Sequence, residues 1–361
     1  MVRPAPSVNS PLLRSPPGNG GCFRTAMAQA VPLIDLSAYY AKPRDPLALK
    51  GLLAQVDRAL CKVGFLCVTG HPVPMVAILA AQEVARRFYD SPQGRKETAR
   101  AVRHKTRGYT PLGDHSLSYS MKGEGERPPA DLFERYRIGP FGFAEDEYHR
   151  SRAEGAYAPN VWPDYLPEFQ SVLSDYYLGM SLLSRDLMRV FAMTLGLEER
   201  WFDAKIDREM SSLCLNHYPA PSGPPLPGQL RAGAHTDYGT LTVVAPTGEP
   251  GGLQVKVRGG DWEDVFVAPG TFVVNIGDMM AQWTNDRWVS TLHRVANPPQ
   301  DVAVPTRRLS LVYFHQPNPD AVVECIPTCR DPQRPPKYAP VTAGDYISRK
   351  INLHFQSYRA A

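Results

Sequence analysis

Two histidines and one aspartate are the residues whose types and spacing most directly suggest chemistry. His235 and Asp237 lie two residues apart just before an expected strand, so on extended backbone both side chains point to the same side. With His293, further along the chain, they supply two imidazoles and one carboxylate, the ligand set of non-haem Fe(II) sites that keep coordination positions open. A His-x-Asp pair alone is more often a hydrogen-bonded surface pair, so neighbouring residues must decide between the two interpretations.

Arg308 and Ser310 form a second pair with the same spacing. The opposite face of their expected strand is apolar, which indicates a strand covered on both sides, where an unpaired arginine is costly. A forked, charged donor beside a hydroxyl is suited to recognising a buried carboxylate. The competing interpretation is an exposed strand on which a surface arginine and a serine merely alternate.

Asn216 and Tyr218 are a third pair on one face, at the start of the region rich in expected strands. They either hydrogen-bond an acidic cosubstrate or are satisfied polar groups of the core, and their spacing favours neither. His217 points the other way and is expected to be structural. The same is expected of the histidines that lack a partner at ligand spacing: His71, His104, His115, His149, His315 and His354.

The elements that must position these groups are mainly strands. Beyond residue 211 the apolar period changes from 3.6 to 2, with short β-rich runs at 241–244, 253–257, 272–276 and 309–314 separated by proline and glycine clusters. Strands of this length and spacing predict a sandwich or barrel.

Upstream, the pattern predicts a mixture of helices and strands. Strands are expected at 31–36 and 64–69, with an amphipathic helix between them that begins at Asp45-Pro46. A long helix is expected from Phe169 to Leu195, where Gly196 ends the pattern, and a further helix at 343–355. Residues 100–160 show no clear periodicity.

Composition excludes several classes of protein. The 361 residues are 43% hydrophobic and 21% charged, which is ordinary globular usage, and a net charge of +4 does not favour nucleic-acid or membrane-surface partners. No apolar run reaches the roughly 18 residues of a membrane-spanning helix. Six cysteines without a paired framework favour a reducing, cytoplasmic environment. Cys325 and Cys329 are a weak metal or redox signal against the alternative of ordinary thiols.

The chain is expected to divide into four parts. Residues 1–28 are rich in Arg, Pro and Ser and lack acids, so we expect a disordered tail, either a dispensable or misannotated start or a transit peptide. Deleting residues 1–26 should leave turnover and thermal stability nearly unchanged. An N-terminal α/β region at 29–205, a core at 206–325 and a C-terminal segment with a helix at 326–361 are expected to follow.

Several linked motifs resemble the isopenicillin N synthase-like branch of Fe(II)/2-oxoglutarate-dependent oxygenases. They appear in the expected order and spacing, and the similarity extends over roughly residues 30–355. Those that carry the resemblance are Asn216-His217-Tyr218-Pro219, His235-Thr236-Asp237-Tyr238-Gly239, Gly252-Leu253-Gln254-Val255, Asn275-Ile276-Gly277-Asp278, Trp283-Thr284-Asn285-Asp286, His293-Arg294-Val295 and Arg308-Leu309-Ser310.

The resemblance implies a double-stranded β-helix, or jelly roll, with flanking helices, in which His235, Asp237 and His293 bind Fe(II). Arg308 and Ser310 match the residues that hold the distal carboxylate of 2-oxoglutarate, and the Asn216–Tyr218 pair matches one that often lies beside that cosubstrate. The implied reaction uses O2, releases succinate and CO2, and hydroxylates, desaturates or cyclises a C–H bond, with ascorbate as a candidate stimulant.

Two alternatives stay open, together with the identity of the substrate. One is an oxidase of the same fold that works without 2-oxoglutarate, and the more remote one is a non-catalytic jelly-roll binding protein. The resemblance favours a small molecule of secondary metabolism, for which Tyr109, Phe133 and Arg135 are candidate contacts, with ordinary packing or a surface ion pair as the alternative. The sequence does not identify the primary substrate, the outcome at the C–H bond or the oligomeric state.

Overall fold

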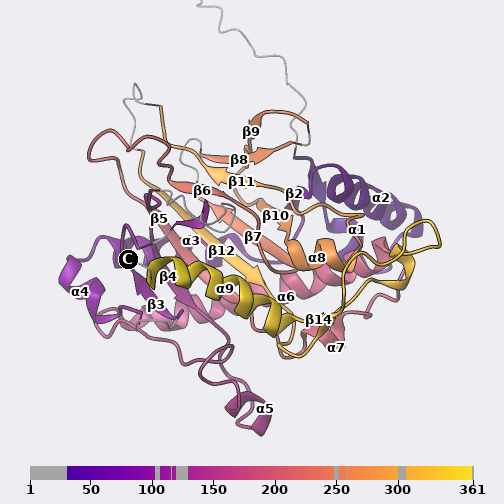
Figure 1. Ribbon diagram of the computed structural model, residues 1–361, viewed down its shortest axis with the longest axis horizontal. Coiled ribbons are helices and arrows are strands. Elements are labelled where there is room, and N and C mark those ends of the chain that lie inside the picture. Colours follow the sequence, from indigo (N-terminus) through magenta and orange to yellow (C-terminus); the bar gives the residue numbers. More distant parts are fainter. Residues whose placement is uncertain are drawn as a thin grey trace, which may run out of the picture.

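The computed structural model describes residues 31–101, 106–114, 116–118, 129–247, 252–257, 259–299 and 306–359, with side chains up to residue 351. The expected tail at 1–28 therefore lies outside the described residues. The described part contains two sheets of eight and four strands, a two-stranded ribbon and flanking helices (Figure 1). This confirms the expected mainly β architecture.

The larger sheet is the platform of the molecule. In spatial order its strands are β1 (Leu33–Asp35), β2 (Phe65–Thr69), β10 (Phe272–Ile276), β7 (Leu241–Pro246), β12 (Arg308–His315), β5 (Ser212–Tyr218), β4 (Glu134–Ile138) and β3 (Gly108–Thr110). Only β1 and β2 pair in parallel. Strands from before and after residue 206 therefore share one continuous sheet.

The smaller sheet lies beside the larger one (Figure 1) and consists of β6 (Ala232–His235), β11 (His293–Val295), β8 (Leu253–Lys256) and β9 (Trp262–Asp264). Antiparallel pairing brings His293 directly opposite His235 across β11 and β6. A short ribbon of β13 (Val322–Val323) and β14 (Val341–Thr342) precedes the last helix.

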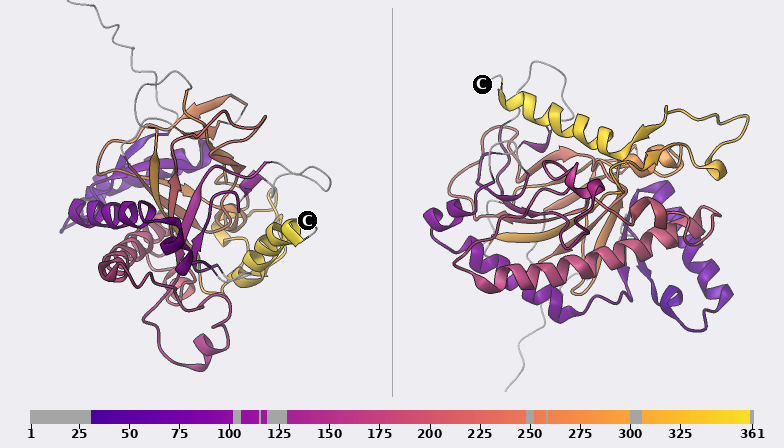
Figure 2. Two further views of the ribbon diagram at one scale, coloured as in Figure 1. Left: turned by 90° about the vertical axis from the view of Figure 1, so that its left-hand side faces the viewer. Right: turned by 90° about the horizontal axis from the view of Figure 1, so that it is seen from below.

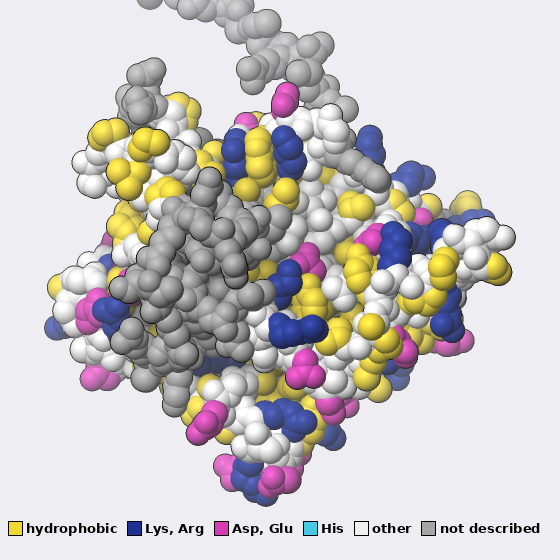
Figure 3. Space-filling view, in the orientation of Figure 1, with side chains coloured by type: hydrophobic (Ala, Val, Ile, Leu, Met, Phe, Trp, Pro, Cys, Tyr) yellow, Lys and Arg dark blue, Asp and Glu magenta, His cyan; other side chains and the backbone are white. Residues whose placement is uncertain are grey.

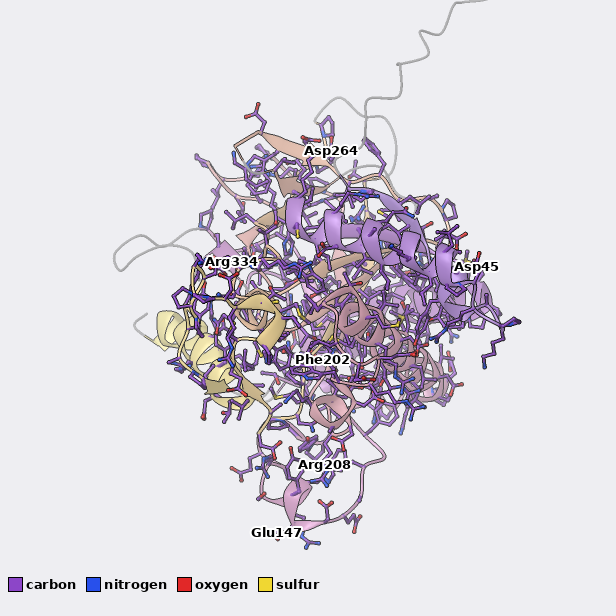
Figure 4. The ribbon with its side chains drawn as sticks, turned by 90° about the vertical axis from the view of Figure 1, so that its right-hand side faces the viewer. Asp45, Glu147, Phe202, Arg208, Asp264 and Arg334 are labelled. Atoms are coloured by element: carbon purple, nitrogen blue, oxygen red, sulfur yellow. The ribbon has the colours of Figure 1, made fainter. Side chains whose placement is uncertain are left out.

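Helices flank the sheets, and the longer ones follow the apolar patterns of the sequence. They are α1 (Ser37–Tyr40), α2 (Pro46–Lys62), α3 (Met75–Tyr89), α4 (Gln93–Thr98), α5 (Glu147–Arg150), α6 (Pro167–Thr194), α7 (Asp203–Ile206), α8 (Asp278–Trp283) and α9 (Ala343–Arg359). Asp45 caps α2 as expected, because its side chain accepts a hydrogen bond from the Leu47 amide; Figure 4 labels it at the start of that helix.

The main core lies between the larger sheet and helices α3 and α6, which occupy one side of it, whereas α9 lies on the opposite side (Figure 2). The long helix α6 buries Phe169, Leu173, Met180 and Phe191 at helical spacing. In the view of Figure 3, basic side chains are interspersed with acidic and apolar ones. No helix in the described part of the chain is both long and apolar enough to cross a bilayer.

Candidate metal centre

Three side chains meet where β6 ends beside β11. The possible ligand atoms of His235, Asp237 and His293 all lie within 4.8 Å of one another, the only such group among the described residues. The His235 Nε2 and His293 Nε2 atoms lie 3.9 and 3.8 Å from Asp237 Oδ1. The structure thus brings the three predicted ligands close together.

Asp237 is held so that one carboxylate oxygen faces the two imidazoles. Its other oxygen, Oδ2, accepts hydrogen bonds from Thr242 Oγ1 and Asn275 Nδ2, each at 2.7 Å. Thr242 and Asn275 lie on the neighbouring strands β7 and β10, directly opposite one another. Sequence reasoning did not assign a role to either residue, although Asn275 stands in one of the motifs that carried the resemblance.

Each imidazole is oriented by the backbone two residues before it. His235 Nδ1 lies 2.8 Å from the Gly233 carbonyl oxygen, and His293 Nδ1 lies 3.1 Å from the Thr291 carbonyl oxygen. A carbonyl oxygen only accepts, so Nδ1 carries the proton and the Nε2 lone pair is left for a metal. The Phe65 ring packs edge-on against the His293 ring, with centroids 5.4 Å apart.

The electrostatics of the site favour the ligand forms of these groups. Burial, reinforced by the positive charge of a protonated His293, lowers the pKa of His235 and keeps its imidazole neutral. Burial alone would raise the pKa of Asp237, but the two histidines and the bonds from Asn275 and Thr242 lower it. Two imidazoles and one carboxylate, with their outer atoms already bonded, fit a divalent iron ion.

The predicted carboxylate-binding residues lie at paired positions of β12 and β5. Arg308 is opposite Tyr218, and Ser310 is opposite Asn216, so all four side chains share one face of the sheet. All four are buried. Thr242, which holds Asp237, projects from the same face, because it pairs with Phe314 of β12 four residues beyond Ser310. The predicted cosubstrate residues and the residue that holds Asp237 therefore lie on the same face of the larger sheet.

The three predicted substrate contacts separate into two groups. Phe133 lies against Tyr218, with ring centroids 5.7 Å apart, and the Arg135 guanidinium carbon lies 5.0 Å from the Phe133 ring centroid. Arg135 also donates to Asn216 Oδ1 at 3.0 Å, so both residues border the predicted cosubstrate group. The structure does not bring Tyr109 there: its ring packs on Phe88, on the side of the sheet that faces the helices.

The other histidines and the cysteines do not form a second metal site in the described residues. His217 bonds to Glu134 through Nδ1 at 2.7 Å and stacks on Tyr89. The cysteines of the described part are free thiols, and Cys325 and Cys329 belong to no cluster of three potential ligands there.

Comparison with known proteins agrees with this geometry. The 2OG-Fe(II) oxygenase superfamily matches residues 210–317, and a family described as the non-haem dioxygenase in morphine synthesis N-terminal matches residues 31–165. The 2-oxoglutarate-Fe(II) type oxidoreductase hxnY of Emericella nidulans is 32% identical, over 92% of this chain and 91% of its own. Validamycin A dioxygenase of Streptomyces hygroscopicus subsp. limoneus is 33% identical, over 83% and 80%.

Solved structures show the same similarity. A full-length Neurospora crassa protein, solved in complex with alpha-KG and thymine, superposes with a TM-score of 0.76 at 28% identity, over 89% of this chain and 96% of that one. This supports the expected jelly-roll arrangement of the two sheets. The centre formed by His235, Asp237 and His293 thus lies in a chain that belongs to the Fe(II)- and 2-oxoglutarate-dependent oxygenases.

Proposed function

We propose that this oxygenase hydroxylates a C–H bond of a small polar metabolite, with His235, Asp237 and His293 as the Fe(II) ligands. The convergence of three ligand atoms, each with its other polar atom already bonded, carries the proposal. Curated relatives are named for validamycin A, homoarginine and proline, which supports a small polar substrate.

The cosubstrate is assigned to the interior face of β12 and β5. Arg308 and Ser310 would hold the distal carboxylate of 2-oxoglutarate, with Asn216 and Tyr218 beside it. When bound, Fe(II) and 2-oxoglutarate supply the oxidation: 2-oxoglutarate, O2 and substrate become succinate, CO2 and hydroxylated substrate. Hydroxylation, rather than desaturation or ring closure, is the outcome that the hydroxylases among the relatives support.

The contribution of the chain is geometric and electrostatic. Thr242 and Asn275 orient the Asp237 carboxylate, and the Gly233 and Thr291 carbonyls orient the imidazoles, so the three ligand atoms already face one point before the metal binds. The surrounding apolar side chains, such as Phe65 and Val255, are buried and limit the access of water. A dry, preorganised site suits a strongly oxidising reaction.

The test combines metal analysis with a substrate screen. His235→Ala, Asp237→Ala and His293→Ala should each lose bound Fe(II), measured by plasma emission, and lose turnover while circular dichroism stays near wild type. His71→Gln is the control, because His71 contacts the Gly270 carbonyl away from the centre. Full metal content and turnover in all three alanine variants would disprove the assignment.

The screen follows metabolite-stimulated conversion of 2-oxoglutarate to succinate, with mass spectrometry of the product. A gain of one oxygen atom is expected, with one succinate per product. Sustained turnover of a substrate with Fe(II) and O2, but without 2-oxoglutarate, would instead favour the oxidase alternative.

A further inference from the structure

A cavity of about 610 Å³ lies between the residues that precede β3, strand β4, the segment around α5, and helix α9. Its size is in the range of small-molecule sites. Figure 4 shows Glu147 of α5 at the tip of a segment that projects from the body of the molecule. Its wall includes three arginines and several apolar side chains, among them Arg107, Arg137, Arg152, Met210, Ile347 and Ile351.

Arg137 enters this cavity from the same face of the sheet that carries the metal and cosubstrate groups. One row across four neighbouring strands consists of Val244, Val312, Cys214 and Arg137. This row lies between the row of Ser310, Asn216 and Arg135 and the row that contains Thr242. Val244 stands two residues from Thr242, which holds the predicted metal ligand Asp237. Three strand spacings, or about 14 Å between backbones, separate Val244 from Arg137. An extended Arg137 side chain and a small molecule can together bridge this distance.

Arg107 brings a second guanidinium to the same place through an unusual fit. The next residue of the chain on that face of β4 is Gly139, and a β-carbon built there would lie 2.1 Å from Arg107 Cζ and 2.2 Å from its Nη2. The Arg107 guanidinium therefore occupies the space that a side chain at position 139 would fill. Arg135, Arg137 and the Arg107 guanidinium follow one another along the interior face of β4.

The charges of Arg107 and Arg137 are not compensated within the described part of the chain. Arg107 is 4% exposed, donates to the Ala156 carbonyl and the Thr106 hydroxyl, and leaves Nε without a partner. Arg137 Nε is also buried without a partner, and no ion pair to a described carboxylate involves either arginine. Burial, and then the charge of Arg137, lower the pKa of Arg107 to about 10, so it stays charged at neutral pH.

The carboxylates that line the cavity lie at its exposed rim. They are Glu154, Asp320 and Asp345; Asp320 accepts a hydrogen bond from Tyr148, and Asp345 accepts one from Thr342. Two adjacent cations, one buried and one half-buried, without an acidic partner among the described residues are costly for the fold. A bound anion that accepts hydrogen bonds from both guanidinium groups offsets this cost.

We infer that the primary substrate carries a carboxylate that Arg137 and Arg107 bind, with its reacting carbon placed several bonds away at the metal centre. The inference rests on the proposed function for the identity of that centre. It assigns Arg137 and Arg107 to substrate binding and leaves Arg308 to 2-oxoglutarate. Met210, Ile347 and Ile351 supply an apolar wall of the cavity that holds the two arginines.

The first experiment needs no turnover. Protein loaded with Mn(II) and saturating 2-oxoglutarate is melted in sodium formate or in sodium chloride of equal ionic strength. Formate, the smallest carboxylate, should raise the Tm of wild type by several degrees more than chloride does, and this difference should vanish in Arg137→Met and Arg107→Met. Arg150→Met, which removes an exposed arginine of α5, should keep it. Equal formate effects in wild type and both cavity variants would overturn the inference.

The second measurement compares the variants without added anion. Because methionine keeps much of the volume but not the charge, Arg137→Met should be at least as stable as wild type. A Tm several degrees below that of Arg150→Met would show instead that the chain itself provides a partner for Arg137.

The third arm uses the substrates that the turnover screen yields. Each carboxylic acid should exceed its primary amide in kcat/KM by at least about thirty-fold, and Arg137→Met should remove most of that ratio without raising the KM for 2-oxoglutarate. Substrates without an anionic group would refute the carboxylate assignment while leaving the oxygenase intact. Loss of 2-oxoglutarate turnover with every compound would refute the proposed function, and the formate shift would still report on the arginines.

Discussion

At the scale of single residues, Asp237 divides its two carboxylate oxygens between the protein and the metal. Thr242 and Asn275 bind Oδ2, so Oδ1 is the atom that remains for the metal. Removing either donor leaves Oδ2 with one hydrogen bond instead of two and holds the carboxylate less firmly. Side chains that orient a ligand in this way typically contribute about 10- to 100-fold to metal affinity.

Thr242→Val and Asn275→Leu should therefore weaken metal binding by roughly 10- to 100-fold each. Isothermal titration calorimetry with Mn(II), done without oxygen, measures the affinity for the metal independently of catalysis. Thr98→Val serves as the control because the Thr98 hydroxyl bonds only to the Arg95 carbonyl on an exposed helix. Unchanged affinity in both variants would mean that these bonds do not position the ligand.

Arg308→Gln should raise the apparent KM for 2-oxoglutarate by roughly thirty-fold or more, and that for the primary substrate far less. Loss of a buried charged partner typically costs about 2 to 5 kcal/mol. Ser310→Ala should act in the same direction but less, since a neutral hydrogen bond contributes about 0.5 to 1.5 kcal/mol. Steady-state kinetics of succinate formation measure both effects.

Arg307→Gln is the matched control for Arg308. Arg307 precedes Arg308 in the sequence, but its guanidinium donates to His217 and Asp90, away from the predicted cosubstrate group. An equal rise in the KM for 2-oxoglutarate in Arg307→Gln and Arg308→Gln would contradict the assignment of the cosubstrate carboxylate.

At the scale of elements, β4 joins two polar environments on its opposite faces. Toward the helices, Glu134 accepts hydrogen bonds from Lys96 and Tyr109 and bonds to His217. Toward the cavity, Arg135 and Arg137 project beside the site. Burial alone would raise the pKa of Glu134, but bonds from His217, Lys96 and Tyr109 outweigh it and lower the pKa to about 2.

Because the pKa of Glu134 is lower in the folded than in the unfolded chain, its contribution to stability is present above pH 4.5 and is lost as the pH falls toward 2. Glu134→Gln should lower the free energy of unfolding at pH 7 by about 3 kcal/mol, since Lys96 stays buried without its partner. Urea unfolding at pH 7 and pH 4 measures this, with the exposed Glu147→Gln as control. A parallel pH dependence in wild type and Glu134→Gln would contradict the role of this carboxylate.

The polar side chains on both faces of β4 explain why this strand was harder to predict from the sequence than its neighbours. The strands around Val243, Val274 and Leu311 have plain apolar runs, and the pairs His235–Asp237 and Arg308–Ser310 follow from the two-residue period alone. In β4, Arg135 and Arg137 alternate with Tyr136 and Ile138, but Glu134 interrupts the apolar face, and five residues are too few to stand out in a segment without clear periodicity. Its neighbour β3 is three residues long. Thr242 and Asn275 could not be assigned because only folding brings them to Asp237.

At the scale of the whole molecule, the site should link ligand binding to unfolding. His293 and Asp237 come from segments far apart in sequence, so the unfolded chain has no preformed site. Ligands at about one hundred times their Kd add roughly 2.7 kcal/mol each to stability.

Mn(II) with 2-oxoglutarate should thus raise the Tm of wild type, and Asp237→Ala should lose this increase while His71→Gln keeps it. Differential scanning calorimetry over a range of ligand concentrations is the measurement. A wild-type Tm that does not depend on ligand concentration would contradict the linkage.

The position of β12 also determines when the larger sheet can form during synthesis. Of the eight strands β12 is made last, yet it lies between β7 and β5 and pairs with both. Until residue 315 has left the ribosome, the sheet exists at most as two separate halves: one carries Thr242 and Asn275, and the other carries Asn216 and Arg137. A nascent chain therefore leaves the edges of β5 and β7 unpaired from the synthesis of β7 until that of β12. The arrival of this one late strand pairs both edges and brings the two halves of the site together.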